Sequence, residues 1–338
     1  MADSLADLPK VAEEELGEGD LDRRLEDRSR PFVARGIAAH WPLVKEGLKG
    51  TRSARDYLVA HHRDRLFDAN IGERGGGDRI FYRDDMGMNF RCERGRLPEL
   101  LARIEAGESD PQAPLIYFSS IDMHDFFDGL AEANRLDLGG RRPLESIWIG
   151  TRTRIAAHND VPDNLAVCAV GRRRFTLFPP DQFANLYIGP LENTPAGRPI
   201  SMVDLAKPDF AAHPRLREAL DNALVAELEP GDAIFVPSLW WHHVEGLEAF
   251  NVLVNYWWSE TPRWLGQPED ALLHAILAVR DLPDEAREHW RAVFDHHVFR
   301  PDGSQRDHLP AGRRGILDPL TPATAGQIRA RLLRGLTQ

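Results

Sequence analysis

The sequence predicts a mainly β protein with α-helical parts, built around a barrel or sandwich of short strands. Closely spaced segments rich in β-branched and aromatic residues run from about residue 141 to 260. The first 140 residues mix strand and helix patterns, and residues 261–338 show apolar residues at helical spacing. We therefore expect an N-terminal α/β part (1–140) packed on a barrel core (141–260), followed by a C-terminal helical region (261–338).

The N-terminal part is expected to contain a short strand and two helices. Residues 31–42 begin and end with proline and are largely apolar in between, as a short strand would be. Ser53 is placed to cap a helix that includes residues 56–59, and Pro98 suits the first turn of a helix over residues 97–104. Three glycines at 75–77 are expected to form a turn, because no Lys-Ser/Thr follows them as in a phosphate-binding loop.

The middle part is expected to hold short strands separated by Gly, Pro and Asp, a spacing typical of all-β barrels and sandwiches. The strand-like segments are residues 145–150, 154–160, 164–171, 174–180, 225–237, 240–246 and 250–258. Residues 181–223 are expected to form an insertion of loop and helix on this frame. Beyond Pro262, apolar residues recur every three or four positions, which predicts two or three helices reaching Leu333.

Composition and charge argue against several classes of protein. No apolar run approaches the ~18 residues of a membrane span, and the acidic N-terminus lacks a signal-peptide pattern. Two cysteines, Cys92 and Cys168, are too few for a disulfide framework and suit a reducing cytoplasm. The formal net charge of −11 disfavours a nucleic-acid partner. We expect a cytoplasmic protein that binds neither membrane nor nucleic acid.

Histidines two residues before an acidic residue are candidate metal ligands, but such pairs are common. With 13 histidines and 53 acidic residues in 338, chance alone predicts about two of them. The chain has three, which are His62/Asp64, His158/Asp160 and His243/Glu245. His62 is expected at a helix end, where residues two apart face different directions. The surrounding pattern must therefore choose among the pairs.

The pair His158/Asp160 has the context of a metal site. It follows a strand-like segment, and alternate side chains of an extended backbone share a face, so both can point into a barrel. A second histidine from a distant strand would complete the two-histidine, one-carboxylate set of non-haem Fe(II) oxygenases. A satisfied core histidine remains the simpler interpretation of each histidine taken alone.

The distant histidine is expected in residues 240–246. His242 and His243 point to opposite faces of a strand, so only one of them can be the ligand. His242 shares the more apolar face with Val244. His243 shares its face with Glu245, a mixture better suited to an outer or interdomain surface. We therefore expect His242 to complete the metal site.

Longer motifs resemble a known family. They are HND at 158–160, NLAVCAVGRRRFTLFPPDQFANLY at 164–187, LEPGDAIFVPSLWWHHVEG at 228–246 and NVLVNYWW at 251–258. Together they resemble the cupin-like JmjC family of 2-oxoglutarate dioxygenases, including its asparaginyl hydroxylases, over roughly residues 30–260. The resemblance implies a double-stranded β-helix, which is a jelly-roll (cupin) barrel, and C-terminal helices that pair two subunits.

The resemblance also implies roles for residues at matching positions. His158, Asp160 and His242 fall at the iron ligands. Arg173 falls where the family places a lysine that binds the far carboxylate of 2-oxoglutarate, and an arginine can grip a carboxylate with two hydrogen bonds. Tyr117 matches a tyrosine that hydrogen-bonds the same carboxylate.

Four further positions belong to the implied cosubstrate pocket. Asn164 and Asn255 match asparagines that line it, and Trp257 matches an aromatic wall. Ile155 departs from the pattern, because a threonine that binds 2-oxoglutarate is often found there. Without the resemblance, Arg173 could be a solvated strand end, and the aromatic residues could be ordinary barrel filling.

The implied function is a hydroxylase that uses Fe(II), 2-oxoglutarate and O₂ on a protein side chain or a small molecule. Such a protein would be a homodimer, and Ser119 and the 181–223 insertion would line the cavity entrance. Two other functions stay open. One is a Zn or Mn cupin with isomerase or lyase activity, which needs no 2-oxoglutarate clamp. The other is a non-catalytic cupin that binds or scaffolds a partner.

Overall fold

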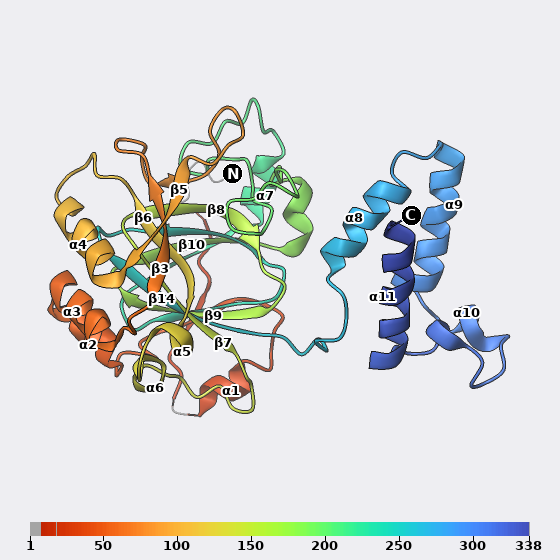
Figure 1. Cartoon of the computed structure of the whole chain (residues 1–338), viewed down its shortest axis with the longest axis horizontal. Helices are drawn as coiled ribbons and strands as arrows, with labels where there is room; N and C mark the ends of the chain where they lie inside the picture. Colours follow the sequence, from red (N-terminus) through yellow and green to blue (C-terminus); the bar gives the residue numbers. More distant parts are fainter. Residues whose placement is uncertain (1–7, 18, 338) are drawn as a thin grey trace. The chain divides into compact units, whose positions relative to one another are not determined.

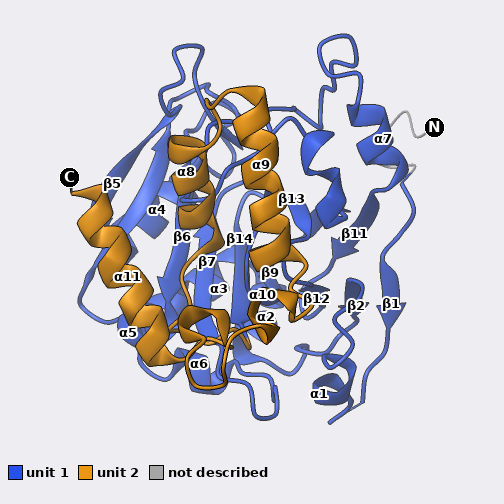
Figure 2. Ribbon diagram, turned by 90° about the vertical axis from the view of Figure 1, so that its right-hand side faces the viewer, with its two compact units in different colours: residues 1–259 blue, residues 260–338 orange. Residues whose placement is uncertain are grey.

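The computed structural model describes residues 8–17 and 19–337 and divides into two compact units, residues 1–259 and 260–338 (Figure 2). The first seven residues, which belong to the acidic N-terminus without a signal-peptide pattern, lie outside the described residues. All the strands in the described residues belong to the first unit, and the second unit is helical.

Two β-sheets form the centre of the first unit (Figure 1). The nine-stranded sheet has the order β1 (Ala12–Glu14), β2 (Phe32–Ala34), β12 (Ala233–Val236), β9 (Asp163–Val170), β14 (Asn251–Trp258), β7 (Leu144–Gly150), β6 (Ile116–Asp122), β3 (Leu66–Gly72) and β5 (Phe90–Arg96). The five-stranded sheet has the order β11 (Leu224–Leu228), β10 (Arg173–Phe178), β13 (Trp241–Gly246), β8 (Thr153–Asn159) and β4 (Arg79–Ile80). Neither sheet closes on itself within the described strands.

The eight strands from β7 to β14 pass repeatedly between the two sheets. β7, β9, β12 and β14 are neighbours in the larger sheet, and β8, β10, β11 and β13 are neighbours in the smaller one. All pairs among them are antiparallel. Apolar residues from both sheets meet in one core cluster, which includes Ala166, Phe175, Val244 and Leu253. The predicted mainly β middle part is thus confirmed as two sheets that share a core.

Each strand segment predicted between residues 145 and 258 contains a strand. One of them, 225–237, holds two strands, because a turn separates β11 from β12. Gly231 has a φ of 98° in this turn, a conformation that glycine adopts without strain. The turn moves the chain from the smaller sheet to the larger one.

Helices of the N-terminal part share a second core with the larger sheet. α2 (Pro42–Lys49), α3 (Thr51–His61) and α4 (Leu97–Gly107) contribute leucines to a cluster that contains β-strand residues such as Phe67 and Val167. The shorter helices are α1 (Asp20–Arg24), α5 (Met123–Phe126) and α6 (Leu130–Ala133).

Most local predictions for this part are confirmed. Pro98 lies in the first turn of α4. The strand predicted over residues 31–42 is confirmed only at its beginning, because β2 ends at Ala34 and a turn follows. The predicted cap is wrong, because α3 begins at Thr51 after Gly50, and the Ser53 hydroxyl donates to the Glu46 carboxylate. The Ser53 hydroxyl therefore bonds a side chain of α2 and does not cap the free backbone N–H groups at the start of α3.

The predicted insertion covers the smaller sheet. It contains a short 3₁₀ helix, η2 (Pro180–Ala184), and α7 (Leu216–Asp221). Apolar residues of this segment, including Leu186, Val203 and Leu216, form a core cluster with Ala157 of β8 and Trp241 of β13. The smaller sheet is therefore buried on both faces where these residues pack.

The second unit contains three longer helices, as predicted, and several short ones (Figure 2). They are α8 (Pro268–Ala278), α9 (Asp284–Phe294), η3 (Asp295–Phe299), α10 (Ser304–Asp307), η4 (Gly315–Leu317) and α11 (Pro322–Leu336). Thr321 caps α11 through a reciprocal hydrogen-bond pair with Thr324. Within the described residues, no helix is long and apolar enough to cross a membrane.

Candidate metal centre and cavity

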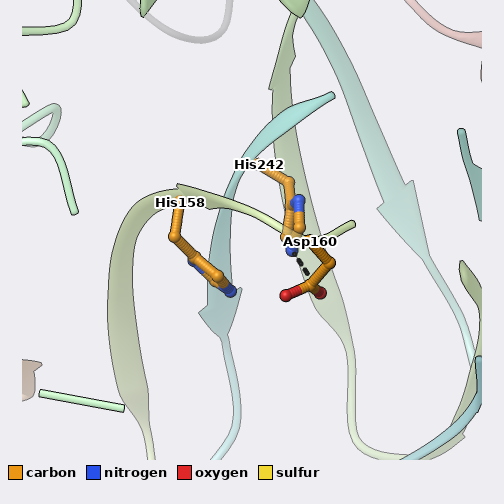
Figure 3. Close-up of side chains that lie close together, drawn as sticks. All are labelled: His158, Asp160 and His242. Atoms are coloured by element: carbon orange, nitrogen blue, oxygen red, sulfur yellow. Dashed lines mark ion pairs between the residues drawn. The ribbon is translucent and has the colours of Figure 1, made fainter. Parts of the chain in front are cut away.

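Three potential metal ligands converge at the ends of two neighbouring strands (Figure 3). His158 lies on β8, Asp160 follows that strand directly, and His242 lies opposite His158 on β13. One ligand atom from each lies within 4.8 Å of the other two. The His242 Nε2 and Asp160 Oδ2 atoms are 3.6 Å apart, and the two imidazole rings are 4.3 Å apart between centroids.

Backbone carbonyls orient both imidazoles. The Nδ1 atom of His158 lies 2.9 Å from the Ala156 carbonyl oxygen, and that of His242 lies 3.0 Å from the Trp240 carbonyl oxygen. A carbonyl only accepts, so each Nδ1 is the donor in this contact, and Nε2 is the nitrogen left to bind a metal ion. Burial, together with the neighbouring His158, lowers the pKa of His242 to about 4. His242 is therefore a neutral imidazole near pH 7, the form that binds a metal ion.

A β-bulge aligns β8 with the site. Between the pairs His158/His242 and Ile155/Val244, β8 advances three residues while β13 advances two. Without the extra residue, strict alternation would send Ile155 and His158 to opposite faces. With it, both side chains line the same cavity. Ile155, the position at which the sequence departs from the family pattern, therefore lines the candidate site itself.

A cavity of about 290 Å³ adjoins the three ligands. This volume is at the lower end of the roughly 300–1,000 Å³ of small-molecule pockets. All eight residues predicted for metal or cosubstrate binding line it, which are Tyr117, His158, Asp160, Asn164, Arg173, His242, Asn255 and Trp257. Ser119 also lines it, together with Pro195, Ala196, Arg198 and Ile200 of the insertion.

Arg173 is a buried cation that faces this cavity. It is 1% exposed, and burial lowers the pKa of its guanidinium. Its neighbours in sequence point outward, where Arg172 pairs with Glu248 and Arg174 with Glu227. Within residues 8–17 and 19–337, no carboxylate forms an ion pair with Arg173, and its Nε has no hydrogen-bond partner. Arg173 is therefore not a solvated strand end.

Polar atoms of other wall residues also lack protein partners. Asn255 donates to Asn164 Oδ1 at 2.7 Å, but Asn255 Oδ1 and the Trp257 indole Nε1 have no partner among the described residues. Burial raises the pKa of Tyr117 to about 12, so its hydroxyl stays protonated and can donate. The cavity wall thus presents the Arg173 guanidinium, the donors of Tyr117 and Trp257, and one amide oxygen of Asn255 that has no donor among the described residues.

The predicted surroundings of His243 are wrong. His243 is 3% exposed and lies beneath the insertion, whose Asp204 pairs with Arg154 on the neighbouring strand. Burial and the nearby charges of Arg154 and Arg79 lower the pKa of His243 to about 3. The face was expected to be outer because the sequence did not show that residues 181–223 fold back over it.

Some cavity residues were not predicted from the sequence. Asn70 on β3, Ser120 on β6 and Trp148 on β7 all line it. Ser120 has a φ of 49° beside an irregularity in the pairing of β6 with β7. Trp148 lies in a predicted strand, so alternation could have placed it on one face, but nothing in its own segment indicated which face encloses a cavity.

Comparison with known proteins identifies the class. Residues 19–263 match the family model described as a cupin-like domain, so the chain belongs to the cupin-like domain family, as the resemblance predicted.

Relatives of several kinds are similar to parts of the chain. Human HSPB1-associated protein 1 is 31% identical over 200 residues, 56% of this chain and 39% of that protein. Human tRNA wybutosine-synthesizing protein 5 is 34% identical over 156 residues, 42% of this chain and 46% of that protein. Lysine-specific demethylase JMJ31 of Arabidopsis thaliana is 32% identical over 121 residues, 35% of this chain and 22% of that protein. The chain thus matches less than half the length of each.

Proposed function

We propose that this chain is an Fe(II)- and 2-oxoglutarate-dependent dioxygenase that hydroxylates a protein side chain or a small molecule. The observation that carries the proposal is Arg173, a buried cation with no carboxylate partner in the part of the chain that the structure describes. It lies in the cavity that His158, Asp160 and His242 also line. A buried charge needs a partner, and the distal carboxylate of 2-oxoglutarate would supply it.

The donor set fits iron. Two imidazoles and one carboxylate on one side of an ion are the ligands of non-haem Fe(II) oxygenases, which leave positions for cosubstrate and oxygen. His158 and His242 would each bind through Nε2, because their Nδ1 atoms are held by carbonyls. When bound, Fe(II) and 2-oxoglutarate supply the oxidative chemistry: O₂ converts 2-oxoglutarate to succinate and carbon dioxide, and its second oxygen atom enters a C–H bond of the substrate.

The chain's own residues bind, orient and shield. Arg173 and the Tyr117 hydroxyl would hold the distal carboxylate, and Asn164 and Asn255 would offer amide groups along the cosubstrate. Trp257 would form an aromatic wall. The buried walls would exclude water from this end of the cavity, which strengthens every interaction with a charged ligand.

The fold supports the same proposal. We infer that β7 to β14 form a double-stranded β-helix, because these eight antiparallel strands divide into two four-stranded groups as in a jelly roll. Two relatives carry names that refer to demethylation of lysine and to wybutosine synthesis in tRNA. Because these two names refer to different substrates, we propose only the class of substrate for this chain, which is a protein side chain or a small molecule.

Anaerobic titration tests the proposal. Adding Fe(II) and 2-oxoglutarate to the protein is expected to produce a visible metal-to-ligand charge-transfer band, and Asp160→Ala is expected to remove it. Arg173→Met is expected to retain stoichiometric Fe(II) while weakening 2-oxoglutarate binding at least tenfold. Arg172→Met, which changes an exposed arginine, is the matched control.

The other functions give different results. A Zn or Mn cupin would bind metal equally well in Arg173→Met but show no band with 2-oxoglutarate in the wild type. A non-catalytic cupin would purify without stoichiometric metal. Either outcome would overturn the proposed function.

A further inference from the structure

Trp148 places an unpartnered hydrogen-bond donor in the cavity wall. Its indole Nε1 is buried and has no partner among the described residues, although its side chain lines the cavity. An indole N–H can only donate. A buried donor without an acceptor is unfavourable, so such a group in a cavity wall indicates a ligand that accepts.

The ring of Trp148 is held firmly in place. It packs against Tyr117 with ring centroids 5.8 Å apart and meets Trp257 edge-on at 5.8 Å. Gly150, two residues further along the same face of β7, leaves room for Tyr117, because a Cβ there would lie 2.9 Å from Tyr117 Cδ2. The indole is thus fixed between two aromatic side chains that line the same cavity.

Strand register places Trp148 at the Arg173 end of the cavity. Leu253 of β14 pairs with Trp148 on one side and with Cys168 on the other, so these three residues form one row across the larger sheet. Burial raises the pKa of Cys168 and of Tyr117, and the nearby charge of Arg173 opposes this rise at both residues. Trp148 therefore contacts one neighbour of Arg173 and shares a row with another.

The groups at this end favour an anion. Arg173, the Tyr117 hydroxyl and the Trp148 indole are all donors, and Arg173 has no carboxylate partner within the described residues. We propose that the Trp148 Nε1–H donates a hydrogen bond to the distal carboxylate of 2-oxoglutarate, as a third donor beside Arg173 and Tyr117. This inference rests on the proposed function and names Trp148 as a cosubstrate-binding residue.

The test compares two ligands in two proteins. 2-Oxoglutarate and 2-oxopentanoate share the keto acid end and the carbon chain, but only the first carries a distal carboxylate. Their dissociation constants are measured from the anaerobic charge-transfer band with Fe(II)-loaded wild type and Trp148→Phe. A hydrogen bond to a charged group is worth enough that its loss should weaken 2-oxoglutarate binding roughly 10- to 100-fold. The constant for 2-oxopentanoate should change less than twofold.

A structural role would give another pattern. If Trp148 only fills the wall, both ligands weaken by the same factor, or neither does, and the inference is overturned while the proposed function stands. If wild type forms no band with 2-oxoglutarate, both fall together. Trp241→Phe is the matched control, because its indole lies outside the cavity and donates to the Pro180 carbonyl oxygen. It should leave both constants unchanged.

Discussion

Arg173 lies between two other arginines, and its burial distinguishes it from them. Alternation along β10 turns Arg174 toward a surface carboxylate and Arg173 into the cavity, and Arg172, just before the strand, pairs with Glu248. The outer two can be solvated, whereas Arg173 has lost its water without gaining an anion within the described residues. Such an arrangement lowers the stability of the ligand-free protein in exchange for binding.

Arg173→Met is therefore expected to stabilise the ligand-free protein. The methionine keeps an apolar stem and removes the buried charge, so the free energy of unfolding should rise by about 1–4 kcal/mol. At a hundredfold excess over the wild-type Kd, adding 2-oxoglutarate to the Mn(II)-loaded protein should stabilise the wild type by about 2.7 kcal/mol. The Mn(II)-loaded variant, which binds at least tenfold more weakly, should gain about 1.4 kcal/mol or less. Urea denaturation with and without ligand measures both effects.

Arg172→Met provides the comparison, since it breaks an exposed ion pair worth about 0–1 kcal/mol. A variant at Arg173 that loses several kcal/mol without ligand would show that the guanidinium has a structural partner.

At the scale of the element, both faces of β13 are buried, and each holds one histidine in a different environment. His242 faces the cavity, and His243 faces the insertion. Burial lowers the pKa of both imidazoles, to about 4 and about 3. Both side chains therefore stay neutral in the folded protein at a pH where histidines of an unfolded chain, with a pKa near 6.5, take up protons.

This difference predicts loss of stability in mild acid for the metal-free protein. Above pH 6.5 neither state holds these protons. Between pH 6.5 and about 4 the unfolded state binds two more than the folded state, so the free energy of unfolding falls as pH falls, by up to about 1.4 kcal/mol per pH unit for each histidine. Denaturation with a chelator at stepped pH measures the slope.

His243→Leu is expected to remove about half of this slope, because one of the two buried imidazoles is gone. A wild-type stability that stays constant from pH 6.5 to 5 would contradict the prediction.

At the scale of the whole molecule, the two units differ in how much they bury. The first unit contains extensive core clusters, whereas Ala325 is the one residue classed as buried among residues 260–337. The second unit exposes large apolar side chains, including Leu277 at 74% and Leu333 at 65%. Helices that bury so little are expected to need a partner surface.

We predict that a second copy of the chain supplies this surface and that the protein is a homodimer. Light scattering should give twice the monomer mass, and Leu277→Asp with Leu333→Asp should reduce it to the monomer. Leu66→Asp, at an exposed leucine of β3, should leave the dimer intact. A monomeric wild type would refute the prediction.

Local features of the fold could be predicted from the sequence. Strands such as β10 and β14 were recognisable because they are short segments rich in β-branched and aromatic residues, and this preference acts within a few residues. The position of α4 followed from Pro98, because proline fits the first turn of a helix. The predicted cap at Ser53 was wrong because the Ser53 hydroxyl donates to Glu46, a residue on another helix.

The candidate ligands His158, Asp160 and His242 could be named from the sequence, because their chemistry and spacing are properties of short segments and of family motifs. Only the tertiary structure decided what surrounds them. Five features depend on register between strands far apart in the chain. They are the pairing of His158 with His242, the bulge at Ile155, the lack of a partner for Arg173 among the described residues, the burial of His243 and the place of Trp148. Register is set by packing of the whole core, which no single segment encodes.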